Sequence, residues 1–246
     1  MSTTDSGATH PWPHASDEAS ALSKVDMWLP TLLSVIAGMV DLIGFLTLGN
    51  IFTAHITGNL VVIAAVLVRG GPLNLAQALA IPVFILAVAA TWLLARAWGR
   101  RGPGLTRLLL VIQFLLLGGL LMFSVITNPS LMPHGLMAGI AVMIAVGAMG
   151  CQFALLRLAL PGAPSTAVMT GNLTNTVLSL LDAQSRSQLL RAGATERLGS
   201  SLPLLIGFLG GCVVAAAAVS LLGDWAWSCP VALAGVAVAW RQQKSL

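Results

Sequence analysis

The stretch FTAHITGNLVVIAAVLV, residues 52–68, is apolar enough to enter a lipid bilayer, yet its first half carries a histidine, two threonines, a glycine and an asparagine. The stretch STAVMTGNLTNTVLSLL, residues 165–181, has the same pattern. Both contain the tripeptide Thr-Gly-Asn (TGN), at 57–59 and again at 170–172, which is an interval of 113 residues in a chain of 246. A polar tripeptide that occurs once in each half of an apolar chain indicates a duplicated sequence.

The composition is typical of a membrane protein. Hydrophobic residues make up 57% of the chain and charged residues 8%, with a mean hydropathy of +0.91, whereas soluble domains carry about 25% charged residues. Apolar runs between short polar breaks predict transmembrane helices, each of about 20 residues. We therefore expect an all-α polytopic membrane domain at 26–246. A disordered cytoplasmic tail is expected at 1–25, which lacks the pattern of a signal peptide.

The distribution of basic residues distinguishes between two topologies. If every apolar segment crossed the bilayer from a cytoplasmic N-terminus, seven Lys and Arg residues would lie inside and five outside, which is no bias. If the two TGN segments instead enter and return on the same side, only Arg69 lies outside and the other eleven lie inside. The eight segments are at about 27–47, 51–68, 79–98, 107–126, 135–158, 165–181, 202–222 and 226–240.

We therefore predict about six transmembrane helices plus two re-entrant TGN segments, with both termini cytoplasmic. Each half of the chain, at about 27–126 and 135–240, would hold three crossings. Because three is an odd number, the second half would begin on the opposite side of the bilayer from the first. The sequence thus predicts an inverted-topology repeat, a plan found in transporters.

The TGN tripeptides suit the turn of a re-entrant half-helix. In each one we expect the glycine to give the backbone freedom, the threonine to cap the helix start and the asparagine to offer amide donors and acceptors. Two half-helices that start near the bilayer centre would direct their positive dipole ends at a polar or anionic group. Ordinary packing between spans is the alternative. The residues of the two tripeptides are therefore candidates for a solute site or pathway: Thr57, Gly58, Asn59, Thr170, Gly171 and Asn172.

Four further residues are candidates for a site or pathway. Asp41 is the one acidic residue inside an expected span, and it is either a coupling carboxyl or a structural one held by the re-entrant segment. His55 could switch near neutral pH or be held structurally. Gln152 stands in the second half near the place of Asp41 in the first, and Arg157 could hold an anionic solute or extend to the interface. Gln113 is expected to form an interhelical hydrogen bond.

Other classes of function have little support. The pI of about 9.6 comes from basic residues in short loops rather than from a basic face, so we expect no nucleic-acid partner. The three cysteines fit no metal spacing, and no metal or cofactor is expected. No G-x-S-x-G or H-E-x-x-H motif occurs, so we do not expect an enzyme. The Gly- and Ala-rich segment 202–222 fits both a helix inside the bundle and the face of a homo-oligomer.

Three stretches carry a family resemblance: AGMVDLIGFLTLGNIFTAHITGNLVV in the first half, and GAMGCQFALLRLAL and TAVMTGNLTN in the second. With them the chain resembles, over 27–240, the YoaK-like family of bacterial integral membrane proteins, a domain of unknown function. The resemblance implies a multi-pass protein of the bacterial inner membrane with about six helices, and it supplies no substrate. Relatives usually have Gln-Asn-Ala where this chain has Gln152-Phe153-Ala154, so a polar role of that asparagine does not carry over.

The sequence favours a small membrane transporter or channel for an unknown polar or anionic solute, with a site near the bilayer centre at the two TGN turns. The expected partners are the lipid bilayer and that small solute. The alternative is a packing or accessory protein with no pathway, and a membrane-embedded enzyme is the third hypothesis.

Overall fold

The computed structural model describes residues 27–99, 102–160, 163, 165–166, 169–185 and 187–243. The expected tail at 1–25 lies outside these residues. Every regular element of the described ranges is helical, as predicted. The elements are α2 (Trp28–Thr47), α3 (Ile56–Arg69), α4 (Leu75–Ala97), α5 (Pro103–Thr127), η1 (Pro129–Leu131), α6 (Leu136–Ala159), α7 (Met169–Ala183), α8 (Gln188–Leu222), η2 (Gly223–Trp227) and α9 (Ser228–Gln243).

Each apolar segment of the sequence corresponds to one of the α-helices, but α8 begins fourteen residues before the expected 202. Its polar first part packs along α7 and is held there by polar contacts. Arg197 donates to the carboxyl of Asp182 at 2.6 Å, and the hydroxyls of Thr176 and Ser201 lie 3.1 Å apart. Hydropathy places the start of α8 too late because this part is stabilised by another helix rather than by lipid.

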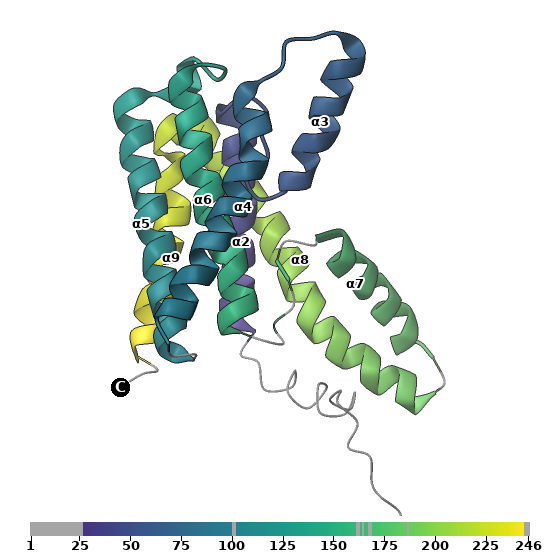
Figure 1. Cartoon of the computed structure of the whole chain (residues 1–246). Coiled ribbons are helices and arrows are strands. Elements are labelled where there is room, and N and C mark those ends of the chain that lie inside the picture. Colours follow the sequence, from purple (N-terminus) through teal and green to yellow (C-terminus); the bar gives the residue numbers. More distant parts are fainter. Residues whose placement is uncertain are drawn as a thin grey trace, which may run out of the picture.

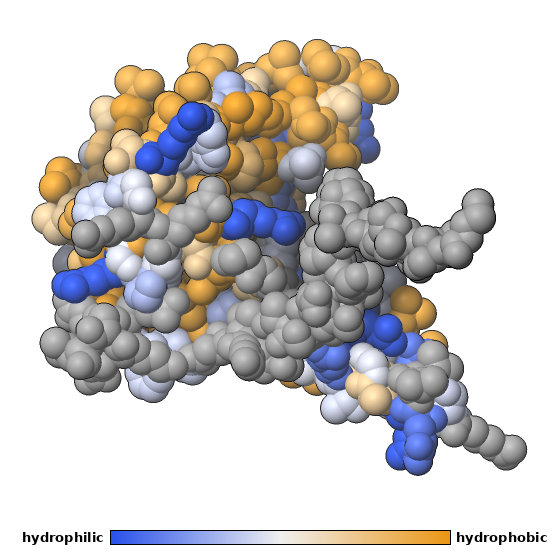
Figure 2. All heavy atoms as spheres, turned by 60° about the horizontal axis from the view of Figure 1, so that its bottom comes forward, coloured by the Kyte–Doolittle hydropathy of each residue, from blue (hydrophilic) through white to orange (hydrophobic). Residues whose placement is uncertain are grey.

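Five helical stretches are long and apolar enough to cross a membrane. Four of them are α2, α4, α5 and α6, and the fifth is the 50-residue stretch Arg191–Trp240, which contains most of α8, η2 and most of α9. Large apolar side chains are exposed on these helices, for example Leu86 at 66% and Leu221 at 81%. Figure 2 shows apolar side chains over much of the surface and hydrophilic ones gathered toward one end. Such a surface is suited to lipid rather than to water.

Two pairs of helices pack closely, α2 with α8 and α4 with α6. A Cβ atom on Gly38 of α2 would lie 2.2 Å from the carbonyl oxygen of Phe208, and one on Gly150 of α6 would lie 2.8 Å from the Cβ of Ala87. Glycine therefore lets both pairs of backbones approach closely. In each pair the first long helix of one half of the chain packs on the third α-helix of the other half.

The ends of the bundle can be followed in Figure 1. At its upper end η1 and η2 meet, where the hydroxyl of Ser130 donates to Asp224 at 2.6 Å. Gly49, just after α2, lies beside Pro133 and so belongs to the same end. The described C-terminal end of α9 is at the lower end. Helices α3 and α7 both begin near mid-height, and from there α3 rises to the upper end while α7 descends (Figure 1).

Candidate functional site

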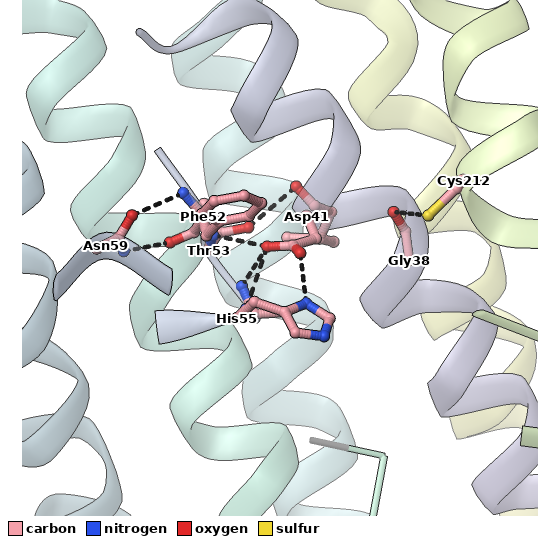
Figure 3. A network of polar contacts seen from close by, with 9 residues as sticks. Gly38, Asp41, Phe52, Thr53, His55, Asn59 and Cys212 are labelled. Carbon is pink, nitrogen blue, oxygen red and sulfur yellow. Dashed lines mark hydrogen bonds and ion pairs between the residues drawn. The ribbon is translucent and has the colours of Figure 1, made fainter. Parts of the chain in front are cut away.

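Asp41 organises the segment that leads into α3. It lies in α2 and is only 5% exposed. Its Oδ1 accepts hydrogen bonds from three consecutive backbone N–H groups, those of Thr53 at 2.8 Å, Ala54 at 2.7 Å and His55 at 3.3 Å (Figure 3). N–H groups at and before a helix start lack helical partners. A carboxyl group from another helix therefore satisfies them here, which is the structural alternative that the sequence left open for Asp41.

His55 is oriented by the same carboxyl group. Its Nδ1 lies 2.6 Å from Oδ2 of Asp41, and its ring meets the ring of Phe208 of α8 edge-on, with centroids 5.1 Å apart. The side chain is still 34% exposed, and Figure 3 shows Nε2 pointing away from Asp41. With the Nδ1 proton directed at the carboxyl, Nε2 is an acceptor in the neutral ring and a donor in the imidazolium. The pair thus presents one oriented polar atom.

The two TGN asparagines make the same contact in the two halves of the chain. Nδ2 of Asn59 donates to the carbonyl of Phe52 at 2.8 Å, and Nδ2 of Asn172 donates to the carbonyl of Ser165 at 2.9 Å. Both contacts span seven residues, and both partners are displaced by 113 residues. Asn59 also accepts from the N–H of Phe52 at 3.0 Å. The sequence repeat is therefore also a repeat of local hydrogen bonding.

The expectation that TGN forms the turn itself was wrong. Helix α3 begins at Ile56 and α7 at Met169, so each tripeptide lies in the first turn of its helix. Thr57 is exposed, and the N-cap position belongs to His55, whose side chain makes no capping bond. Thr57 cannot be the N-cap because it already lies inside the helix, while Asp41, which is distant in sequence, accepts the N–H groups just upstream.

Gly58 also lies inside α3 rather than at a turn, and its φ is not positive. A Cβ atom at this position would lie 3.0 Å from the ring of Phe52, so glycine allows that ring to pack on the helix. In the second half, Thr170 is exposed and Gly171 is partly buried, both in the first turn of α7. Gly58 therefore serves close packing with Phe52 rather than a left-handed turn.

Gln152 belongs to a separate network inside the bundle. It is fully buried. Its Nε2 donates to the carbonyl of Leu33 in α2 at 2.9 Å, and its Oε1 accepts from Nε2 of Gln113 in α5 at 2.6 Å. The interhelical hydrogen bond expected of Gln113 is confirmed. These contacts join α2, α5 and α6, and neither Leu33 nor Gln113 belongs to the Asp41–His55 pair.

Arg157 lies at the lower end of α6 and is exposed. It lines a cavity of about 780 Å³ together with Arg96 and Trp92 of α4. Arg96 is a residue that the sequence did not single out. Hydropathy treats both arginines as ends of separate spans, and only the packing of α4 beside α6 brings them to one cavity.

The two half-sites differ in charge. The segment before α3 meets the carboxyl of Asp41, but α6, which holds the corresponding place in the second half, contains no Asp or Glu. Phe153 instead packs against Phe84, with ring centroids 6.1 Å apart. Thr166 stands 113 residues after Thr53 and is buried, and its hydroxyl has no hydrogen-bond partner among the described residues. The first half therefore carries the acid and the imidazole, and the second half carries neither at the matching places.

Comparisons with known proteins identify the family of the chain. The model of the family described as "Protein of unknown function (DUF1275)" matches residues 29–240. A 35-residue stretch is 54% identical to the UPF0700 transmembrane protein YoaK of Bacillus subtilis (strain 168), which covers 14% of this chain and 16% of that protein. No solved structure matches the chain. Because the family model spans most of the sequence, the chain belongs to the DUF1275 family and is a YoaK-like multi-pass membrane protein.

Proposed function

We propose that the protein is a small transporter or channel for a polar or anionic solute, in which six helices cross the bilayer and α3 and α7 are re-entrant half-helices. Dividing the stretch Arg191–Trp240 at η2 adds two crossings to the four of α2, α4, α5 and α6. Helix α3 has 14 residues, and such a helix is about 21 Å long. It is too short to cross a hydrocarbon core of about 30 Å.

The opposite directions of α3 and α7 carry the proposal. Both begin near mid-height, and in both an asparagine of the first turn donates to a carbonyl seven residues earlier. The two helices nevertheless run to opposite ends of the molecule (Figure 1). Equal local structure with opposite direction is what an inverted-topology repeat produces. Helix α2 packs on α8, and α6 packs on α4, so the first helix of each half contacts the third α-helix of the other half. This packing supports the same arrangement.

The charges favour one orientation in the membrane. Arg69 lies at the upper end of α3, whereas Arg96, Arg157 and Arg191 lie toward the lower end. By the positive-inside rule the lower end faces the cytoplasm, together with both termini. For a bacterial protein, we propose that this membrane is the inner membrane.

The polar groups around the half-helix starts define the solute class. Three polar groups take no part in the hydrogen bonds of the described residues: the oriented Nε2 of His55 and the exposed hydroxyls of Thr57 and Thr170. Helix N-termini add positive potential, which Asp41 offsets at α3 but which no acidic residue of α6 offsets at α7. A solute with hydroxyl, amide or anionic groups suits this combination.

A flux assay tests the proposal. The full chain is reconstituted in liposomes, and stopped-flow light scattering measures permeability to a panel of neutral polar solutes and small anions. We expect at least one solute to exceed empty liposomes, and its flux to fall at least about fivefold in His55→Gln and in the isosteric pair Thr57→Val/Thr170→Val. Thr174→Val, exposed on the same helix as Thr170, is the control. The proposal is wrong if no solute exceeds the empty liposomes or if these variants match the control.

A packing or accessory role is the second candidate. It is favoured by the burial of Asn59, which is 0% exposed and uses both ends of its amide within its own segment. An asparagine so placed stabilises the half-helix without meeting a solute. Folded protein with no flux for any solute would support this role.

A further inference from the structure

A second polar site lies at the lower end of the bundle, between α4, α5 and α6. It is the cavity of about 780 Å³ that is lined by Trp92 and Arg96 from α4, Gly102 and Leu105 at the start of α5, and Arg157 from α6. The guanidinium of Arg96 lies over the ring of Trp92, with its Cζ 5.2 Å from the ring centroid. The cavity thus combines two cations with an apolar and aromatic wall.

The positive charge of this cavity is not neutralised by the described part of the fold. Helices α4, α5 and α6 contain no Asp or Glu. The ion pairs within the described residues are His55–Asp41 and Arg197–Asp182, and neither involves Arg96 or Arg157. Helix α5 also begins here, at Pro103, and its N-cap residue Gly102 provides no side-chain cap. Its first N–H groups and its positive dipole end add to the two guanidinium groups.

We propose that this cavity binds a phosphate group, supplied by the head group of an anionic phospholipid. Two guanidinium groups without carboxylate partners among the described residues offer the paired donors that phosphate oxygens accept. Trp92 is 45% exposed, and tryptophan favours the boundary between acyl chains and head groups. Basic pockets between transmembrane helices are suited to such head groups. The site is separate from His55, and it stands whether or not the protein conducts a solute.

Native mass spectrometry of the full chain in detergent micelles tests this inference. Dioleoyl phosphatidylglycerol and dioleoyl phosphatidylcholine are titrated separately, and inorganic phosphate is added as a competitor. We expect one phosphatidylglycerol per chain to bind at least about tenfold more tightly than phosphatidylcholine. The preference for phosphatidylglycerol should disappear in the double variant Arg96→Gln/Arg157→Gln. It should be partly retained in Arg157→Lys, which keeps the positive charge but loses the paired N–H donors of the guanidinium group. Arg191→Gln removes an exposed charge at the same end and should bind as the wild type does.

Three results would overturn the inference. Equal binding of the two lipids would show that the cavity does not distinguish an anionic head group from a zwitterionic one, whose choline cation offsets the phosphate charge. An equal loss in Arg191→Gln would assign the effect to the general charge of this end. Displacement of phosphatidylglycerol by millimolar inorganic phosphate, with equal or tighter binding of the free ion, would assign the site to soluble phosphate instead. If the double variant does not fold, Arg157→Lys still tests the inference, because a partial loss of the preference for phosphatidylglycerol is expected of it.

Discussion

Oδ2 of Asp41 lies 2.6 Å from Nδ1 of His55, while Oδ1 of the same carboxyl group accepts the N–H groups of Thr53, Ala54 and His55. One side chain of α2 therefore fixes both the backbone that leads into α3 and the imidazole that this backbone presents. Changes at position 41 act on folding and on the orientation of His55 together, but conservative and apolar substitutions should separate the two effects.

Replacement of Asp41 by leucine should lower the free energy of unfolding by about 3 kcal/mol or more, because buried N–H groups without an acceptor cost about 1–3 kcal/mol each. Asp41→Asn keeps one acceptor oxygen and should cost about 1 kcal/mol. Denaturant unfolding in detergent micelles measures both. Asp182→Asn is the control, since that carboxyl group is in a half-exposed pair and should contribute less than about 1 kcal/mol. A leucine variant as stable as this control would contradict the role assigned to Asp41.

Asn59→Leu should destabilise the protein more than Asn172→Leu. The first change removes the partners of both the N–H and the carbonyl of Phe52, and the second removes a donor to the carbonyl of Ser165. We expect losses of about 2–4 and about 1–2 kcal/mol in the free energy of unfolding, respectively. Asn175→Leu, exposed on α7, should change stability little. Equal behaviour of all three leucine variants in the same unfolding assay would remove the structural role of the TGN asparagines.

Gly38→Ala should separate α2 from α8, because the new Cβ atom would lie 2.2 Å from the backbone oxygen of Phe208. Overpacking of this kind costs about 1–3 kcal/mol, and more where backbone must move. The matched control is Gly147→Ala in α6, where a Cβ atom has open space and alanine favours the helix by up to about 1 kcal/mol. Thermal unfolding should therefore shift in opposite directions for the two variants. A wild-type melting temperature for Gly38→Ala would show that these helices are not in close contact.

The Gln113–Gln152 hydrogen bond should show energetic coupling. Each single change to leucine leaves a buried amide group without its partner and should cost about 1–3 kcal/mol. The double change removes both groups and should cost less than the sum of the single changes, by about 0.5–2 kcal/mol. A double-mutant cycle on unfolding free energies measures this difference. Strict additivity would place the two side chains in separate environments.

Single cysteines, introduced after replacement of Cys151, Cys212 and Cys229, test the topology. Impermeant thiol reagents added to intact cells should label Gly71→Cys and Leu131→Cys, and should not label Gly104→Cys or Ala192→Cys. All four positions are exposed, so failure to react reports the side of the membrane. Labelling at 104 together with protection at 71 and 131 would indicate eight crossings and would remove both the re-entrant helices and the inverted repeat.

Local properties of the sequence predict much of this architecture. The eight apolar segments correspond to the eight described α-helices because hydropathy reports burial or lipid contact along a continuous stretch. The errors fall where a helix end is stabilised by residues distant in sequence. Helix α3 starts at Ile56, ahead of TGN, because Asp41 receives the N–H groups before it. Helix α8 starts at Gln188 because α7 packs along its polar first part.

The sequence by itself determined the membrane class, the positions of the apolar segments and the interval of 113 residues between the two TGN tripeptides, since these depend on composition and order alone. Only the tertiary structure decided that Asp41 and His55 form a pair, that Gln152 bonds to Gln113 instead, and that Arg96 and Arg157 share a cavity. The physical reason is that hydrogen bonds and close packing depend on which helices become neighbours. Contacts such as that of Gly38 with Phe208 join residues from opposite halves of the chain, and no local pattern of residue types encodes them.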